Sequence, residues 1–565
     1  MSETLVSIVD PSVACITRTD GHWFVFDVPA DVLAEISDPT RAVDGDVLSQ
    51  RARGGSLVFV PSAEGTVRIW RGALAAHDVF FAWRPDRGLV ISDHILNVIA
   101  ELPQRLRRPG GPGLVEHYVC THVYDRRTFV ERIQRPGMGD RVTIDTATGS
   151  ATFEVVEPLH QISYDDAETD VVERVERAID AIITPLSGED RVACTFSGGV
   201  DSTLLASFTG PDTPLLMLKP DTPEFAIETE YATRAAGLLG RSLAEREVRE
   251  TEFMTLLERR IDRAGNPHGH YVSPVLADLF EFDADVFILG EGADSVFGTD
   301  RGLRRISGAF ANRTGLAALD AASHLPGSTG RRARQVRSYA REYAEPTTSM
   351  SGAFAGALAY GDDALARRVF GDDAVDEVYG LQMDAVVSHI DLESSQSDRF
   401  HQHLESVMWR WTYGDLNSSF RATALATGKR AVSPYTEASV VDALRTVPAD
   451  RRYVKKLAGK WVLKEILERR VPGYPINQRK NATAIPFHRY YTDGPLVGVW
   501  SELDVPDLFT GSMRSELVDR PSSMTWNAIT HAVWSDRIET NPDLQPLASS
   551  TATTIVHTPV GGGPA

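Results

Sequence analysis

Short runs of apolar residues, separated by turn residues, dominate the first 155 residues of the chain. Five runs rich in Val, Phe and Trp lie at 23–28, 56–62, 66–70, 78–83 and 88–93. Such runs are typical of β-strands. A further run at 141–149 predicts a strand that enters a turn, and Gly-Gly-Pro-Gly at 110–113 predicts a loop. The first part of the chain is therefore expected to be β-rich.

The pattern changes near residue 165. Over about 165–186 apolar residues recur at helical spacing, with acidic residues near the start, which predicts a helix leading into a second domain. Apolar strands and helical patterns then alternate, as in a parallel α/β sheet, and the expected strands are 192–196, 214–218 and 285–290. From about residue 305 to 470 the pattern is almost entirely helical.

These patterns divide the chain into three parts. We expect one domain over 1–160 and a second, α/β domain with a helical C-terminal half over 165–510. The segment 540–565, which ends in GGGPA, predicts a disordered tail.

Composition narrows the functional classes. Hydrophobic residues make up 42% and charged residues 24% of the chain, as in globular proteins, and apolar runs are too short for a membrane span. The start, MSETLVSIVDPS, lacks the features of a secretory signal, and three scattered cysteines predict neither disulfides nor zinc. We therefore expect a cytoplasmic protein. The net charge of −20 argues against a nucleic-acid partner.

A motif of small residues follows the apolar run 192–196. The sequence Ser-Gly-Gly-Val-Asp-Ser-Thr at 197–203 joins a buried strand to a helix. Glycines let the backbone approach an anion, loop N–H groups can point at it, and an aspartate beside phosphate implies Mg²⁺ between them. The residues expected to bind the phosphates and the ion are Ser197, Gly198, Gly199, Asp201 and Ser202.

This loop lacks the GxxxxGK[ST] spacing used for phosphoryl transfer. It resembles instead the pyrophosphate loop of the N-type ATP pyrophosphatases, which include asparagine, GMP, NAD and argininosuccinate synthetases and tRNA-modifying enzymes. The resemblance implies ATP, attack at the α-phosphate, an adenylated substrate and release of pyrophosphate. It also implies that adenine lies near the backbone of Phe196, Leu218 and Gly290.

A second motif, Gly-Glu-Gly-Ala-Asp-Ser-Val-Phe-Gly at 290–298, resembles the asparagine synthetase signature GEGSDEVFGG. A strand end here would deliver two carboxylates to the crevice where the first loop opens. The resemblance implies that Asp294 shares Mg²⁺ with Asp201. It also implies that Glu291 accepts a proton from the attacking amine or stabilises the ammonium. The chain departs from the signature at Ser295 and at 299–300.

The third motif lies where most of the chain's few lysines are found. Lys and Arg together number 58, yet only seven are lysines, and five of these lie within 455–480. Lys and Arg are not interchangeable in chemistry. The run KKLAGKWVLK at 455–464 resembles the family's Gly-Lys-x-x-Leu-Arg segment. The match implies that Lys460 is the catalytic lysine, which neutralises charge on the α-phosphate and the oxyanion. The segment 430–437 resembles the family's ARVPFLD segment. This match supports the alignment of the chain with the family and assigns no chemical role to a residue.

The first domain also carries a resemblance. Residues 66–150, through their strands and RPGMGDRVTIDTATG, resemble the second half of the class II glutamine amidotransferase domain, which implies an Ntn-type αββα fold. The active glutaminase needs a cysteine at position 2, whose own amine activates it. Here position 2 is Ser2. We therefore expect a degenerate domain without glutaminase activity, although a nucleophilic role for Ser2 stays open.

Together the motifs imply an AMP-forming carbon–nitrogen ligase that uses ATP and Mg²⁺. Relatives without a glutaminase, such as β-lactam synthetases and lasso-peptide cyclases, use an amine already in the substrate. We expect cyclisation or ligation of a small-molecule or peptide substrate in specialised metabolism. Other proteins of the same biosynthetic route are candidate binding partners. Two alternatives stay open: ammonia-dependent, asparagine synthetase-like amidation, and a non-catalytic ATP-binding scaffold.

Overall fold

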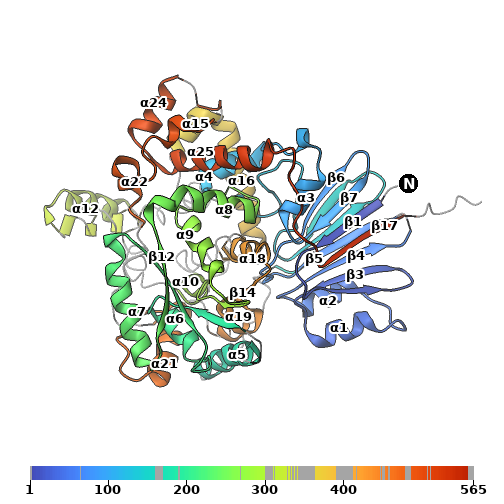
Figure 1. Ribbon diagram of the computed structural model, residues 1–565, viewed down its shortest axis with the longest axis horizontal. Coiled ribbons are helices and arrows are strands. Elements are labelled where there is room, and N and C mark those ends of the chain that lie inside the picture. Colours follow the sequence, from blue (N-terminus) through green and yellow to red (C-terminus); the bar gives the residue numbers. More distant parts are fainter. Residues whose placement is uncertain are drawn as a thin grey trace, which may run out of the picture.

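The computed structural model forms two units side by side (Figure 1). It describes residues 3–557 except 64, 159–169, 187, 189–190, 268, 299–309, 311, 328, 331, 334–335, 338–339, 341–362, 390–411, 415, 446, 448–451, 456–457, 477–484, 506 and 510. The smaller unit contains the N-terminal strands and the helices packed on them, and the larger unit contains the parallel sheet and most of the other helices.

Two facing sheets form the core of the N-terminal unit. Within the described residues, one has the order β17-β1-β7-β6 and the other β2-β3-β4-β5-β8-β9. Their strands are β1 (Glu3–Ile8), β2 (Ala14–Thr17), β3 (Gly21–Phe26), β4 (Ser56–Pro61), β5 (Thr66–Arg71), β6 (Phe80–Arg84), β7 (Gly88–Ser92), β8 (Asp140–Asp145), β9 (Ala151–Val155) and β17 (Thr551–Val556). Successive side chains of a strand point to opposite faces of its sheet, so each sheet can pack against the other sheet on one face and against helices on the other. Phe24 and Ile69 of one sheet share a core with Phe81 and Ile91 of the other.

Helices cover the outer face of each sheet. On the six-stranded sheet, Trp23 and Trp70 pack on Val32 and Leu48 of α1 (Ala30–Ser37) and α2 (Gly45–Arg51). On the four-stranded sheet, the outward-facing residues pack on α3 (Ile95–Glu101) and α4 (Gly111–Cys120). The order of layers is therefore helix, sheet, sheet, helix. All six strands predicted for this region are present.

Two predictions for this unit were wrong. The predicted loop at 110–113 is the start of α4, because Pro112 falls in the first helical turn, where its missing N–H costs no hydrogen bond. The segment 540–565 is not wholly a disordered tail. Its residues Thr551–Val556 form β17, which pairs antiparallel with β1 and buries Ile555, so the C-terminal segment completes the N-terminal sheet (Figure 1). Residues 558–565 lie outside the described part.

The larger unit is built on a sheet in which every described pair of strands is parallel, in the order β12-β11-β10-β13-β14. The strands are β10 (Val192–Thr195), β11 (Leu215–Pro220), β12 (Leu243–Val248), β13 (Val286–Ile288) and β14 (Arg430–Val432). The three predicted strands β10, β11 and β13 are confirmed. The two edge strands were missed, because β12 carries three charged residues and β14 spans only three residues.

Helices cover both faces of this sheet. One face packs on α5 (Val171–Leu186), which confirms the predicted helix, on α6 (Val200–Ala206), α7 (Ala226–Leu238), α19 (Ala438–Arg445) and α21 (Trp461–Arg470). Phe287 on the opposite face belongs to a core with Phe280 and Ala424 of η5 (Asp278–Glu281) and α18 (Asn417–Leu425). The mixed α/β class with a parallel sheet is confirmed.

The described residues after β13 are mostly helical, as predicted for 305–470. The longer helices among them include α12 (Arg313–Ser323), α15 (Asp363–Phe370), α16 (Asp372–His389), α24 (Gly511–Asp519) and α25 (Ser523–Trp534). A short hairpin of β15 (Val454–Lys455) and β16 (Ala458–Gly459) precedes α21. Each helix in the described ranges is too short or too polar to cross a bilayer.

Candidate active site

The loop after β10 is locked in a shape that only glycine permits at its centre. Gly198 has a φ of +69°, and a Cβ atom on it would lie 2.5 Å from Ala232 Cα of α7. Ser202 Oγ accepts a hydrogen bond from the backbone N–H of Ser197 across 3.1 Å. The hydroxyl of Tyr474 donates to the Gly198 carbonyl across 2.7 Å. The loop is therefore held from both sides before any ligand binds.

Lys460 lies beside this loop. Its Nζ atom is 2.6 Å from Asp201 Oδ2 and 2.8 Å from Asp294 Oδ1. The backbone sets this position: Lys460 has a φ of 53°, immediately precedes α21, and donates its N–H to the Phe297 carbonyl across 3.2 Å. Three residues that are widely separated in the sequence thus meet at one point, as their motifs predict.

Burial and charge oppose each other at Lys460. Only 12% of its side chain is exposed, compared with 15% for Asp201 and 64% for Asp294. Burial by itself would lower the pKa of Lys460, but the charges and hydrogen bonds of the two carboxylates outweigh it and raise the pKa above its usual value. The side chain is therefore a permanent cation at neutral pH.

The second motif turns sharply after β13. Gly292 has a φ of +84°, and a Cβ atom on it would lie 2.1 Å from Thr436 Cγ2. Its N–H donates to Glu291 Oε1 across 3.1 Å. The turn leads into α10 (Ala293–Phe297). It places Glu291 in the wall of a cavity and Asp294 against Lys460.

This cavity has a volume of about 250 Å³ and opens at the carboxyl ends of β10, β11 and β13, where ligands bind in parallel α/β sheets. Seven predicted site residues line it: Phe196, Ser197, Asp201, Ser202, Leu218, Gly290 and Glu291. Gly198, Gly199, Asp294 and Lys460 are not part of the wall. Lys460 contacts the wall residue Asp201, and Asp294 contacts Lys460.

Both apolar and acidic residues line the cavity. Its apolar wall includes Val272, Leu276 and Phe420, while Glu228 and Glu291 add carboxylates. The apolar surface can accept a flat ring such as adenine.

Asp201 suits a Mg²⁺ ion. Its Oδ1 atom is buried and accepts no hydrogen bond from the described residues, whereas Oδ2 is bound by Lys460. Protein Mg²⁺ sites combine one or two carboxylates with phosphate and water oxygens. The described residues hold no cluster of three His, Cys, Asp or Glu side chains suited to a metal. Any ion here would therefore depend on phosphate for most of its ligands.

Sequence reasoning missed several residues of the site. Tyr435 donates its hydroxyl to the Asp201 carbonyl across 2.7 Å, and Tyr474 holds the loop as described. Phe420 and Glu228 line the cavity. One available signal was the resemblance at 430–437, which contains Tyr435 but gives it no role. Ser2 and residues 299–300 lie outside the described residues.

The sheet, the serine–glycine loop and the buried lysine define a nucleotide-binding α/β domain. The family model for asparagine synthase matches residues 174–523. Because this match covers more than half of the chain, the protein belongs to the asparagine synthase family. The family assignment points to an ATP-dependent carbon–nitrogen ligase. A comparison with curated proteins gave no match.

Proposed function

We propose that the chain forms an amide between a carboxylate and an amine in two steps. A carboxylate oxygen attacks the α-phosphorus of ATP, the bond to the β-phosphate oxygen breaks, and pyrophosphate leaves. The amine nitrogen then attacks the acyl carbon, the bond to the AMP oxygen breaks, and the amide forms.

The observation that carries this proposal is the position of Lys460, whose Nζ is bound to Asp201 next to the glycine loop. In both steps negative charge develops near the α-phosphate, and a fixed, desolvated cation stabilises it more than water would. The loop around Gly198 holds the pyrophosphate through its backbone. Glu291, in the cavity wall, accepts the proton that the amine loses.

Mg²⁺ fits the same place. Asp201 and Asp294 would hold the ion, and its chemistry would be to neutralise the charge on the departing pyrophosphate. Lys460 now lies between these two carboxylates, so the aspartates would divide their oxygens between the ammonium and the ion.

We further propose that the amine belongs to the substrate and is not released from glutamine. The helix–sheet–sheet–helix layers support a glutaminase-like ancestry for the N-terminal unit, but its cysteines do not support catalysis. Cys15 lies at the surface on β2, where partial desolvation raises the pKa of its thiol and makes it a poorer nucleophile, and Cys120 is buried within 2.9 Å of the Gln382 amide nitrogen. Ring closure or ligation in specialised metabolism follows as the proposed role.

The test is to incubate the full chain with Mg²⁺, ATP and a panel of acids that carry amines, and to identify the spent nucleotide by mass spectrometry. AMP and pyrophosphate formed without glutamine or ammonium support the proposal. Strict dependence on ammonium would favour asparagine synthetase-like amidation, and ADP would contradict the chemistry. Equal product from Lys460→Ala would contradict the role given to Lys460, and a parent chain that yields no spent nucleotide with any acid, with or without ammonium, would favour the non-catalytic scaffold.

A further inference from the structure

Among the contacts between the two units, a group of polar and charged side chains converges on one segment of the larger unit, 413–442. Ser418 donates a hydrogen bond to Asp78. Arg421 binds Asp10 and Asp27, and Asp442 accepts a hydrogen bond from Arg53 across 3.2 Å. Ser418 and Arg421 both lie on α18, whereas Asp442 does not.

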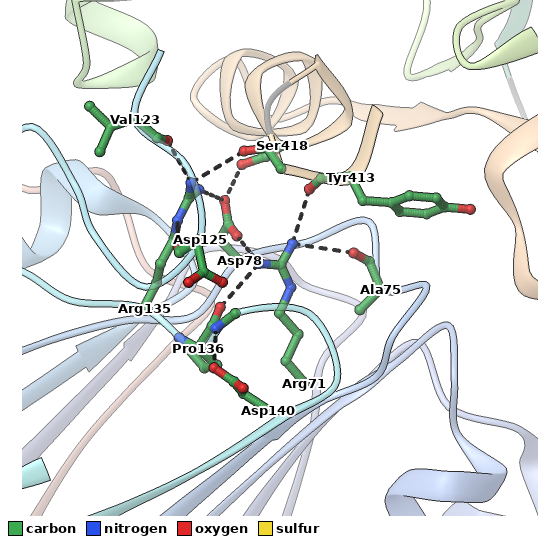
Figure 2. Close-up of polar contacts among 12 residues, drawn as sticks. Arg71, Ala75, Asp78, Val123, Asp125, Arg135, Pro136, Asp140, Tyr413 and Ser418 are labelled. Carbon is green, nitrogen blue, oxygen red and sulfur yellow. Dashed lines mark hydrogen bonds and ion pairs between the residues drawn. The ribbon is translucent and has the colours of Figure 1, made fainter. Parts of the chain in front are cut away.

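Asp78 is the centre of the first contact (Figure 2). Its two oxygens lie 2.8 Å from Arg71 and 2.8 Å from Arg135, and its side chain is 1% exposed. Arg71 also donates to the Tyr413 carbonyl across 3.1 Å, just before α18. A buried carboxylate bound by two guanidinium groups keeps a fixed position, so the Ser418 hydroxyl that donates to it is fixed as well.

Arg421 makes the second contact. Its guanidinium donates to Asp27 across 2.8 Å and to Asp10 across 2.5 Å. Asp10 is itself held in place, because its backbone N–H donates to Asp93 across 2.9 Å. Two-point bonding of this kind fixes both the position and the orientation of an arginine.

The geometry of α18 separates these anchors from the cavity. Ser418 and Arg421 are three residues apart and therefore lie on one face of the helix. Phe420 lies on a different face, where it lines the nucleotide cavity and packs against the core that contains Leu216 and Leu289. The helix thus has one face bound to the N-terminal unit and another face that forms the cavity wall.

We propose that the N-terminal unit positions the wall of the ATP cavity through α18, with Ser418 and Arg421 as positioning residues for the ligation. This inference rests on the proposed function, because it assigns Phe420 to the wall of the nucleotide site. It gives the N-terminal unit a role that needs no glutaminase: its aspartates, Asp78, Asp10 and Asp27, set the distance of Phe420 from the nucleotide.

The test is calorimetric titration of α,β-methylene-ATP with Mg²⁺ into four full-length proteins: the parent, Ser418→Ala, Phe420→Ala and the double variant. We expect Ser418→Ala alone to weaken binding about threefold to tenfold, and to have less than about a twofold effect once Phe420 is Ala. Arg421→Lys, which keeps the charge but loses the two-point bond, should weaken binding in the same sense. Asp442→Asn is the matched control, because it removes a contact between the units that does not start from α18.

Thermal unfolding of each protein separates positioning from folding. A lower unfolding temperature with unchanged affinity for Ser418→Ala, or equal effects with and without Phe420, would overturn the inference while leaving the proposed function intact. An equal loss of affinity in Asp442→Asn would overturn it as well. A parent chain that does not bind the nucleotide would overturn the proposed function, and this inference with it.

Discussion

Lys460 donates a hydrogen bond from Nζ to Asp201 Oδ2 across 2.6 Å, although 259 positions separate the two residues in the chain. Asp294 completes the contact on the other side of the ammonium. These two carboxylates are the ones that, under the proposed function, would also hold Mg²⁺ with ATP.

Replacing Lys460 with Met keeps most of the volume and removes the charge. We expect the rate of AMP formation to fall roughly 100-fold to 1000-fold, because the charge that develops on the α-phosphate loses its fixed partner. Since the pKa of Lys460 is raised, its charge is lost only in strongly alkaline solution, so the parent's rate should show no step from this group near neutrality. Lys219→Met, at an exposed lysine, is the control. A rate within about twofold of the parent would contradict the assigned role.

The residues proposed to carry the chemistry could be named from the sequence because their motifs are local. Gly198 and Asp201 lie in one loop, Glu291 and Asp294 in one turn, and Lys460 in a window that contains most of the lysines. Their convergence follows from the parallel sheet, whose carboxyl strand ends meet at one edge.

Other parts of the site could not be predicted, because their roles depend on distant packing. Tyr435 and Tyr474 act through hydroxyl groups that reach backbone carbonyls more than 230 positions away. Phe420 looks like any core aromatic residue until α18 is placed beside the cavity. The sequence of β17 predicts a tail, because this Thr-rich segment gains a partner only when the chain returns to β1.

Gly198→Ala tests whether the loop must approach α7 this closely. The new Cβ would lie 2.5 Å from Ala232 Cα, so the loop must move away from α7. Its backbone N–H groups would then no longer point at the phosphates of the nucleotide. We expect nucleotide affinity, measured by calorimetry, to fall at least about tenfold. Gly240→Ala is a matched control: Gly240 has a φ of +66° and no other atom within 4 Å of the added Cβ. It should cost about 1–2 kcal/mol of stability without changing affinity. Equal affinities for the two variants would contradict the prediction.

Removal of residues 541–565 tests the role of β17. The truncation exposes the edge of β1 and the apolar surface under Ile555, and it removes the 2.7 Å contact between Thr4 and His557. We expect the free energy of unfolding to fall by at least about 2 kcal/mol and light scattering to rise on heating, because an open strand edge can pair with other chains.

The matched control for this truncation removes only residues 558–565 and keeps β17. It should unfold like the parent chain. If the two truncated proteins unfold at the same temperature, β17 contributes nothing measurable to the sheet.

Glu437 lies between the two units and makes stability depend on pH. Burial, followed by the charge of Asp27, raises the pKa of Glu437 to about 7, although Arg421 opposes this shift. The ordinary pKa is 4.5, so between pH 4.5 and 7 the folded chain binds this proton more tightly than the unfolded chain. The contribution of Glu437 to the unfolding free energy therefore falls as pH rises through this window and is constant above it.

Glu437→Gln removes this titration while keeping the shape of the side chain. At pH 8 we expect the variant to be more stable than the parent by up to about 3 kcal/mol, from about 1.4 kcal/mol for each unit of pKa. The difference should shrink as pH falls toward 4.5.

Asp93 and Glu157, whose pKa values are raised by burial to about 6 and about 7, also make the unfolding free energy of the parent fall as pH rises. Urea unfolding of the parent and of Glu437→Gln at each pH isolates the contribution of Glu437, because both proteins contain Asp93 and Glu157. Glu502→Gln, at an exposed position, should follow the parent, and a constant difference between Glu437→Gln and the parent from pH 5 to 8 would show that the carboxyl stays ionised in the folded chain.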